Sequence, residues 1–188
     1  MKIRKICSLL AFSICGFALS SHAQGDIEKP PSVAEQTKKI IEVVNLYARA
    51  IACDADDGLS GKNIAAMTPL TNMLERDEAK FAVLWNGDLG CQGGSGTSGA
   101  RLAIVGVGAG DTFYVNPYES EPAVDAGLPR YVERIVGATK DTLVFDVRDY
   151  SDRDANCCPS LRQRITIRQL PNGKWQRVST KKLPPAKD

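Results

Sequence analysis

Histidine is nearly absent from this chain of 188 residues, in which His22 is the single example. His22 lies within residues 1–23, where a basic start, an apolar run and a small-x-small sequence follow one another as in a secretory signal peptide. Cleavage after Ala23 would leave a mature chain without histidine. That absence excludes a Ser-His-Asp or Cys-His mechanism and any zinc site that uses histidine.

Long apolar runs and a strong net charge are also missing. The apolar run at 6–19 spans about 14 residues, fewer than the ~20 that a membrane-spanning helix needs. The whole chain has 24 basic and 22 acidic residues, and removal of Lys2, Arg4 and Lys5 with the leader changes its net charge from +2 to −1. Such a balance argues against broad nucleic-acid binding. The signal-peptide pattern of 1–23 predicts a bacterial periplasmic protein. The short apolar run and the balanced charge predict no transmembrane segment and no nucleic-acid partner.

Four segments are expected along the chain. Residues 1–23 form the signal peptide, 24–31 a flexible leader, 32–180 one disulfide-bonded domain, and 181–188 a disordered tail rich in lysine and proline. The mature chain of about 165 residues is long enough for one domain that buries roughly 68–70% of its unfolded surface. The sequence gives no indication of the oligomeric state.

The first expected element is an amphipathic helix over 33–52. Ser32 and Glu35 have the spacing of a capping box, in which each side chain binds a backbone N–H of the first turn. Apolar residues then recur at steps of three and four, as on one face of a helix. A weaker helix is expected over 63–76, where Pro69 would kink or split it.

From Lys80 onward the apolar residues recur with a period of two, which predicts strands. One of these segments, 101–107, is apolar on both faces, which indicates a central, buried strand. The expected strands are 81–85, 101–107, 112–115, 131–136, 142–148, 161–169 and 175–180. The predicted fold class is α+β, with the N-terminal amphipathic helix packed on a curled antiparallel sheet of about six strands.

Four cysteines remain after cleavage: Cys53, Cys91, Cys157 and Cys158. An even number in an exported chain predicts two disulfides. Adjacent Cα atoms lie only about 3.8 Å apart, below the usual disulfide range of roughly 4.4–6.8 Å, so a ring between the last two would be strained. We therefore expect Cys53 and Cys91 each to bond one member of the adjacent pair. A redox-active adjacent pair and a zinc site of four thiolates are the alternatives.

The segment Cys91–Thr97 matches the nucleophile segment of trypsin-like serine proteases, Cys-Gln-Gly-Asp-Ser-Gly-Gly, at five of seven positions. Ser95 has no histidine to activate it, and the chain is too short for the double barrel of those enzymes, so we interpret the match as chance. A loop of this composition exposes backbone donors and allows close approach to a partner. Its candidate binding residues are Gly93, Gly94, Ser95, Gly96 and Thr97.

An acidic segment before the adjacent cysteines begins with the spacing of a calcium loop, Asp152-x-Asp154-x-Asn156. The sixth and twelfth positions lack the Gly and Glu of an EF-hand, so that motif is excluded. A weaker calcium site that uses Asp149, Asp152 and Asp154 remains an alternative to a solvated loop. We expect no metal or cofactor, and we keep Asp152 and Asp154 as candidate binding residues.

Arginines at 162, 164 and 168 share one face of the strand 161–169. This stripe could bind carboxylates on a partner or on a cell-wall glycan, and Arg162 and Arg164 are the candidate binding residues. The plainer interpretation is a solvent-exposed face with partners on the neighbouring strand, where Asp146 could supply a carboxylate.

The most distinctive stretch is 149–160, an acidic run followed by Cys157-Cys158-Pro159-Ser160 and then a β-hairpin. It is similar to the C-terminal part of the LppP/LprE-type secreted lipoproteins of bacteria, over about 40 residues. The chain departs from that family in lacking a convincing lipidation cysteine, since Cys15 follows the bulky Ile14. The resemblance implies export and disulfides, but no activity is established for the family.

Our leading functional hypothesis is a periplasmic binding protein without catalytic activity, of the inhibitor or immunity type, that acts on an envelope or cell-wall enzyme. Its contact surface would be the 91–99 loop beside the 149–160 loop, and its partner a protein. The first alternative is a hydrolase that works with paired carboxylates. Its candidates are Asp111, Glu119, Glu121 and Asp125. The second alternative is an envelope scaffold or accessory protein.

The cleavage site is directly testable. When the full-length chain is expressed in a Gram-negative host, Edman sequencing or intact-mass analysis of the exported protein should show Gln24 as its first residue, because Ala23 completes the small-x-small sequence. A mature protein that still begins at Met1 would contradict the assignment of 1–23 as a signal peptide.

Overall fold

The computed structural model describes residues 29–91, 97–155 and 157–185. Its first element is the helix α1 (Val33–Ile51), as the apolar period predicts. The capping box is present: the Glu35 amide donates to the Ser32 hydroxyl at 3.3 Å, and the Ser32 amide donates to the Glu35 carboxylate at 2.8 Å. These bonds satisfy two backbone donors that would otherwise lack partners at the start of the helix.

The first antiparallel sheet, sheet A, contains five strands. Its strand order is β1-β3-β4-β5, and β2 pairs with the part of β3 that β1 does not cover. Short 3-10 turns η1 (Gly61–Asn63), η2 (Met73–Glu78) and η3 (Ala109–Asp111) connect its strands. The strands are β1 (Asp54–Ala55), β2 (Ile64–Thr68), β3 (Lys80–Asp88), β4 (Ser98–Val107) and β5 (Phe113–Val115).

The second sheet, sheet B, is a four-stranded antiparallel meander. Each strand pairs with the next along the chain, in the order β6-β7-β8-β9. The strands are β6 (Tyr131–Ala138), β7 (Thr142–Asp149), β8 (Leu161–Gln169) and β9 (Trp175–Lys182). The last strand continues two residues beyond the expected domain end at 180 and includes two lysines of the expected tail.

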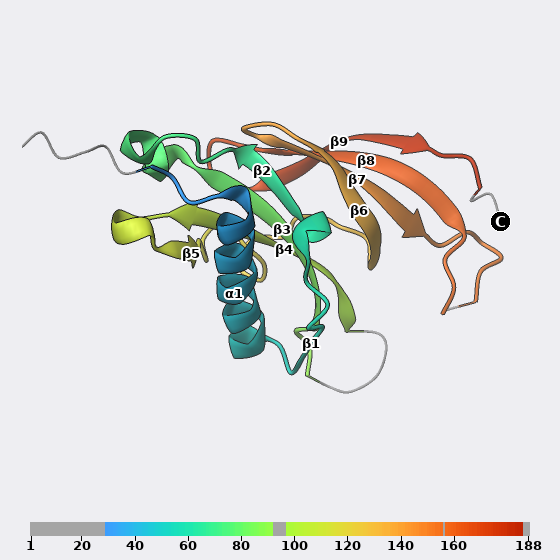
Figure 1. The fold of residues 1–188 in the computed structure, drawn as a ribbon. Coiled ribbons are helices and arrows are strands. Elements are labelled where there is room, and N and C mark those ends of the chain that lie inside the picture. The colour runs from blue at the N-terminus through green and yellow to red at the C-terminus, as the bar shows by residue number, and fades with distance from the viewer. Residues whose placement is uncertain (1–28, 92–96, 156, 186–188) are drawn as a thin grey trace, which may run out of the picture.

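Sheet A is the middle of three layers, with α1 on one face and sheet B on the other (Figure 1). Alternate residues of β3 separate accordingly: Phe81 and Val83 pack with α1, whereas Ala82 and Leu84 pack with sheet B. The α+β class is confirmed, but a single sheet of about six strands is wrong, because the described residues form nine strands in two sheets. Two apolar faces on one strand require two covering layers.

The expected helix over 63–76 is also wrong. The segment begins as strand β2, which pairs with β3 through Ile64 and Val83, and it continues after Pro69 as η2. The proline separates the two parts, and pairing with β3 fixes the first part as a strand. Within the described residues, no helix combines the length and apolarity needed to cross a membrane.

The core between the two sheets should contribute strongly to stability. Ile165 on β8 has no exposed surface, and Ile165→Ala should lower the free energy of unfolding by about 2–5 kcal/mol through lost burial and a residual cavity. Val178→Ala on β9 is the control, because Val178 is 46% exposed and should change stability by less than about 0.5 kcal/mol. Urea unfolding of the oxidised protein measures both. Equal losses would show that sheet B does not bury its inner face against sheet A.

A candidate binding groove around the start of β6

A groove surrounds the start of β6, beside the ends of β3 and β4 and along the outer face of sheet B, where Arg148 pairs with Arg162. It consists of two adjoining cavities of about 550 and 820 Å³ that share Asn86, Arg130 and Tyr131. We call them the acidic lobe and the basic lobe from the charges that line them. The acidic lobe is further lined by Asp54, Ala55, Asp56, Asp57, Gly87, Ser98 and Gly99. The basic lobe is further lined by Val132, Glu133, Arg148, Cys157, Cys158, Pro159, Ser160, Arg162 and Pro185.

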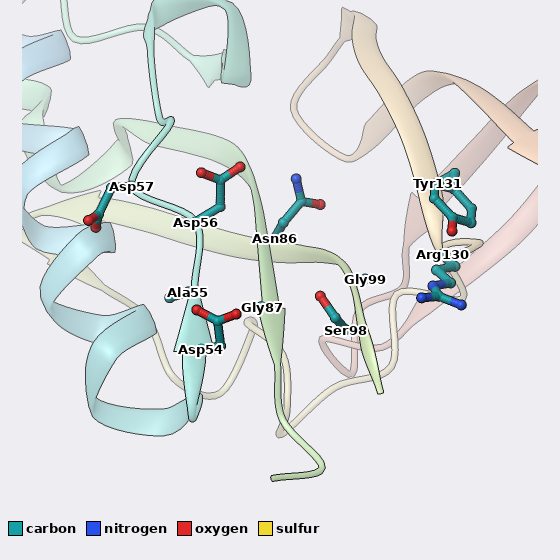
Figure 2. A pocket seen from close by; sticks show the side chains of 10 residues that line it. All are labelled: Asp54, Ala55, Asp56, Asp57, Asn86, Gly87, Ser98, Gly99, Arg130 and Tyr131. Atoms are coloured by element: carbon teal, nitrogen blue, oxygen red, sulfur yellow. The ribbon is translucent and has the colours of Figure 1, made fainter. Parts of the chain in front are cut away.

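The aspartates of the acidic lobe stand on one side of that cavity, and Arg130 and Tyr131 stand on the opposite side (Figure 2). Their segment is fixed to β3 by the backbone, because the Asp56 amide donates to the Asn86 carbonyl at 3.1 Å. Asp57 is neutralised by an ion pair of 2.7 Å with Arg49 of α1. The acidic character of the lobe therefore comes from the other two carboxylates.

The close approach of the two walls depends on Gly99. A Cβ at this position would lie 3.3 Å from Cγ and 3.4 Å from Cα of Arg130. The next residue along β4 completes the contact, since the Ala100 amide donates to the Arg130 carbonyl at 3.0 Å. The chain entering β6 is thus held against the end of β4, and the Arg130 side chain is placed between the two lobes.

The basic lobe is built around one carboxylate shared by two arginines. Glu133 accepts hydrogen bonds from Arg148 at 2.6 Å and from Arg162 at 3.0 Å. Burial acts to raise the pKa of Glu133, but the bonds from Arg162 and Arg148 outweigh it and hold that pKa below its usual value. With Arg130 counted, the lining has three guanidinium groups and one carboxylate, an excess of two positive charges.

Aromatic contacts hold Tyr131 at the junction of the two lobes. The Arg130 guanidinium lies 5.1 Å from the centroid of its ring, and the ring of Tyr150 meets it edge-on at 6.3 Å. The Tyr131 hydroxyl also donates to the Cys157 carbonyl at 3.4 Å. Tyr131 therefore connects sheet B to the loop that contains the adjacent cysteines.

The disulfides join Cys53 to Cys91 and Cys157 to Cys158. The expected cross-pairing, in which the first two cysteines each bond one of the adjacent pair, is therefore wrong. Pairing of β1 with β3 already brings Cys53 beside the end of β3, where its amide donates to the Asp88 carbonyl at 3.0 Å. The adjacent cysteines line the basic lobe, whereas β1 lines the acidic lobe.

The expected Gly-rich binding loop falls mostly outside the described residues: Gly93, Gly94, Ser95 and Gly96 are not described, and Thr97 leads directly into β4. The described residues at its start are fixed by Asp88, whose carboxylate accepts from the amides of Gly90 at 2.9 Å and Cys91 at 3.2 Å. At the other end of the loop, Ser98 lines the acidic lobe. The role of the loop as a contact surface stays a prediction.

The carboxylate of Asp154 stabilises the loop that contains it, between β7 and β8. Its carboxylate accepts from the amides of Ser151 and Ser160, both at 2.8 Å, and from the Ser160 hydroxyl at 2.7 Å. These bonds hold the pKa of Asp154 far below its usual value. Asp152 is exposed and has no such partners among the described residues. The described residues contain no group of acidic, cysteine or histidine side chains that could hold a metal ion.

The arginine stripe of β8 meets carboxylates on the neighbouring strands. Arg164 binds Asp146 at 2.7 Å, and Arg134 binds the same carboxylate at 2.9 Å. Hydrogen bonds from Arg164 and then Arg134 lower the pKa of Asp146 despite burial. The plainer interpretation of the stripe is thus confirmed for Arg164. Arg162 is also paired, but it lines the basic lobe of the groove.

The four carboxylates of the hydrolase alternative lie outside both lobes of the groove. Glu119 forms an ion pair of 2.7 Å with Lys80 in a separate cavity of about 280 Å³. Glu121 is buried, which raises its pKa, and Asp125 accepts from the Gly127 amide within a turn. None of the four, Asp111 included, lines the groove.

Sequence reasoning missed the residues at the centre of the groove: Asn86, Arg130, Tyr131 and Glu133. They come from two different sheets, and no spacing along the chain connects them. One sequence feature could have indicated them: a basic and an aromatic residue, Arg130 and Tyr131, directly follow a proline at the start of a predicted strand. Comparisons with protein-family models, with curated proteins and with solved structures find no match for this chain.

The role of Asp154 predicts a measurable effect on its loop. Because its pKa in the fold lies below the ordinary value of ~3.9, the ionised carboxylate stabilises the loop at neutral pH, and that contribution is lost only as the pH falls through the folded pKa. At pH 7, Asp154→Ala should speed amide hydrogen exchange of Ser151 and Ser160 by about tenfold or more. Asp152→Ala is the matched control and should leave both rates unchanged. Similar acceleration by both variants would contradict this role.

Proposed function

We propose that this chain is an exported, non-catalytic binding protein that receives a segment of a partner protein in the groove around the start of β6. Inhibitors and immunity proteins that act on envelope or cell-wall enzymes are the class we favour. The observation that carries the proposal is the groove itself: two adjoining cavities of opposite charge that meet at Asn86, Arg130 and Tyr131.

The walls of the groove are fixed before any partner binds, which favours recognition. The Cys53–Cys91 disulfide fixes the segment before β1 to the chain just after β3, and Asp154 holds the loop that precedes β8. Glu133 holds two arginines of the basic lobe. Because little side-chain freedom remains to be lost, such a surface binds at a lower entropic cost.

The residues that line the groove suit binding better than nucleophilic catalysis. Ser98 and Ser160 supply hydroxyl groups, but the described lining contains neither histidine nor lysine to take a proton from them. The guanidinium groups of the basic lobe stay charged at any physiological pH and act as fixed hydrogen-bond donors. Such a set holds charged groups of a ligand without transferring protons.

A change that fills the groove tests this function. Ser98 lines the acidic lobe, so Ser98→Trp should reduce recovery of a specific partner from periplasmic extract by at least about tenfold, because the indole occupies the cavity. The partner is captured on the tagged, oxidised protein and quantified by mass spectrometry at moderate salt.

Leu46→Trp is the matched control, because Leu46 lies on α1 and is 64% exposed. It adds the same indole outside the groove and should leave recovery unchanged. Melting temperatures of the two variants show whether Ser98→Trp still folds. Equal recovery with wild type and a folded Ser98→Trp protein would place the partner elsewhere and overturn the proposal.

A further inference from the structure

We infer that the basic lobe binds a carboxylate of the partner segment while the acidic lobe receives a cationic group of the same segment. This inference rests on the proposed function and specifies the chemistry of the occupant. It follows from the distribution of paired and unpaired charges along the groove. Such a site distinguishes the anionic end of the bound segment from its cationic end.

The excess positive charge of the basic lobe has no counterpart among the residues that the structure describes. Glu133 is the single carboxylate among its described lining residues, and it is shared by Arg148 and Arg162. Among the described residues, no carboxylate lies within 4.0 Å of the Arg130 guanidinium. A carboxylate from outside would therefore complete the charge balance of the lobe.

The arginines are also placed to recognise a carboxylate by shape. Arg162 keeps only 22% of its side-chain surface exposed, and Arg148 keeps 48%. A planar guanidinium binds a carboxylate through two parallel N–H···O bonds, and such bonds are stronger where water is partly excluded. Because Glu133 already orients both groups, an incoming carboxylate does not need to order them.

Apolar surface beside these charges can hold the chain that carries the carboxylate. The ring of Tyr131, the adjacent disulfide Cys157–Cys158, and Pro159 all line the same lobe. These groups have few rotatable bonds, so contact with them costs little conformational entropy. The basic lobe thus combines donors for an anion with a stiff surface for methylene groups.

The acidic lobe sets the direction of the bound segment. Asp54 and Asp56 have no cationic partner within 4.0 Å among the described residues, whereas Asp57 is paired with Arg49. Two unpaired carboxylates attract an ammonium or guanidinium group and repel a carboxylate. Attraction at one end and repulsion at the other together give specificity for one orientation.

The test uses synthetic peptides with blocked termini and a fluorescent label, in three charge types. One type carries Lys and Asp separated by two, four or six alanines, the second carries Asp with Gln in place of Lys, and the third carries Lys with Asn in place of Asp. Fluorescence anisotropy gives Kd at low and at moderate salt. At least one Lys/Asp peptide should bind at least about tenfold more tightly than either single-charge peptide of the same length.

Arg130→Gln should weaken the Lys/Asp and Asp-only peptides by at least about fivefold, because it removes a positive charge of the basic lobe. It should not weaken the Lys-only peptide, because Arg130 also lines the acidic lobe and its loss reduces repulsion of Lys there. Arg168→Gln is the matched control: it removes the same charge from the arginine stripe of β8, outside the groove. Arg130→Lys, which keeps the charge, should lose less affinity than Arg130→Gln. The double variant Asp54→Asn with Asp56→Asn should weaken the peptides that contain Lys and not the Asp-only peptide.

Each result has a distinct meaning. Equal affinity for the three peptide types, no binding at millimolar concentration, or an equal loss with Arg168→Gln would overturn the inference. Groove-dependent capture of a protein, as judged with Ser98→Trp, would then leave the proposed function in place. If instead the peptides bind as expected but no groove-dependent protein is captured, the charge preference stands and the proposed protein partner fails.

Discussion

Burial of β3 and β4 on both faces is the constraint on which the rest of this structure depends. Their side chains alternate between α1 and sheet B, so each strand contributes to two separate cores. Neither α1 nor sheet B could bury its apolar surface without this shared layer. Because the two strands carry both cores, they fix the positions of the outer layers and of everything attached to them.

The groove follows from this arrangement at the end of the shared layer. Asn86 of β3 and Ser98 of β4 are polar, and there sheet B no longer covers sheet A. The start of β6 and the loop with the adjacent cysteines form the other side of the groove. The polar ends of the same strands that hold the fold together therefore form the base of the candidate site.

Ion pairs divide the arginines of sheet B into structural and available groups. Asp146 is nearly fully buried between Arg134 and Arg164, and both guanidinium groups bind its carboxylate. Glu133 does the same for two further arginines, but at the edge of the groove, where a ligand can reach them. A sequence shows only a stripe of like charges. The position of each carboxylate across the sheet decides which arginines remain accessible to a ligand.

The sequence by itself determined the elements with strong local signals: the capped helix α1, the period-two strands and the both-face apolar pattern of 101–107. These depend on neighbours within a few residues, so they can be predicted without a fold. The tertiary structure decided the second sheet, the disulfide pairing and the groove, because each depends on segments brought together from distant parts of the chain. Pairing of β1 with β3 places Cys53 beside Cys91, and contact between β4 and the entry to β6 places Arg130 between the two lobes.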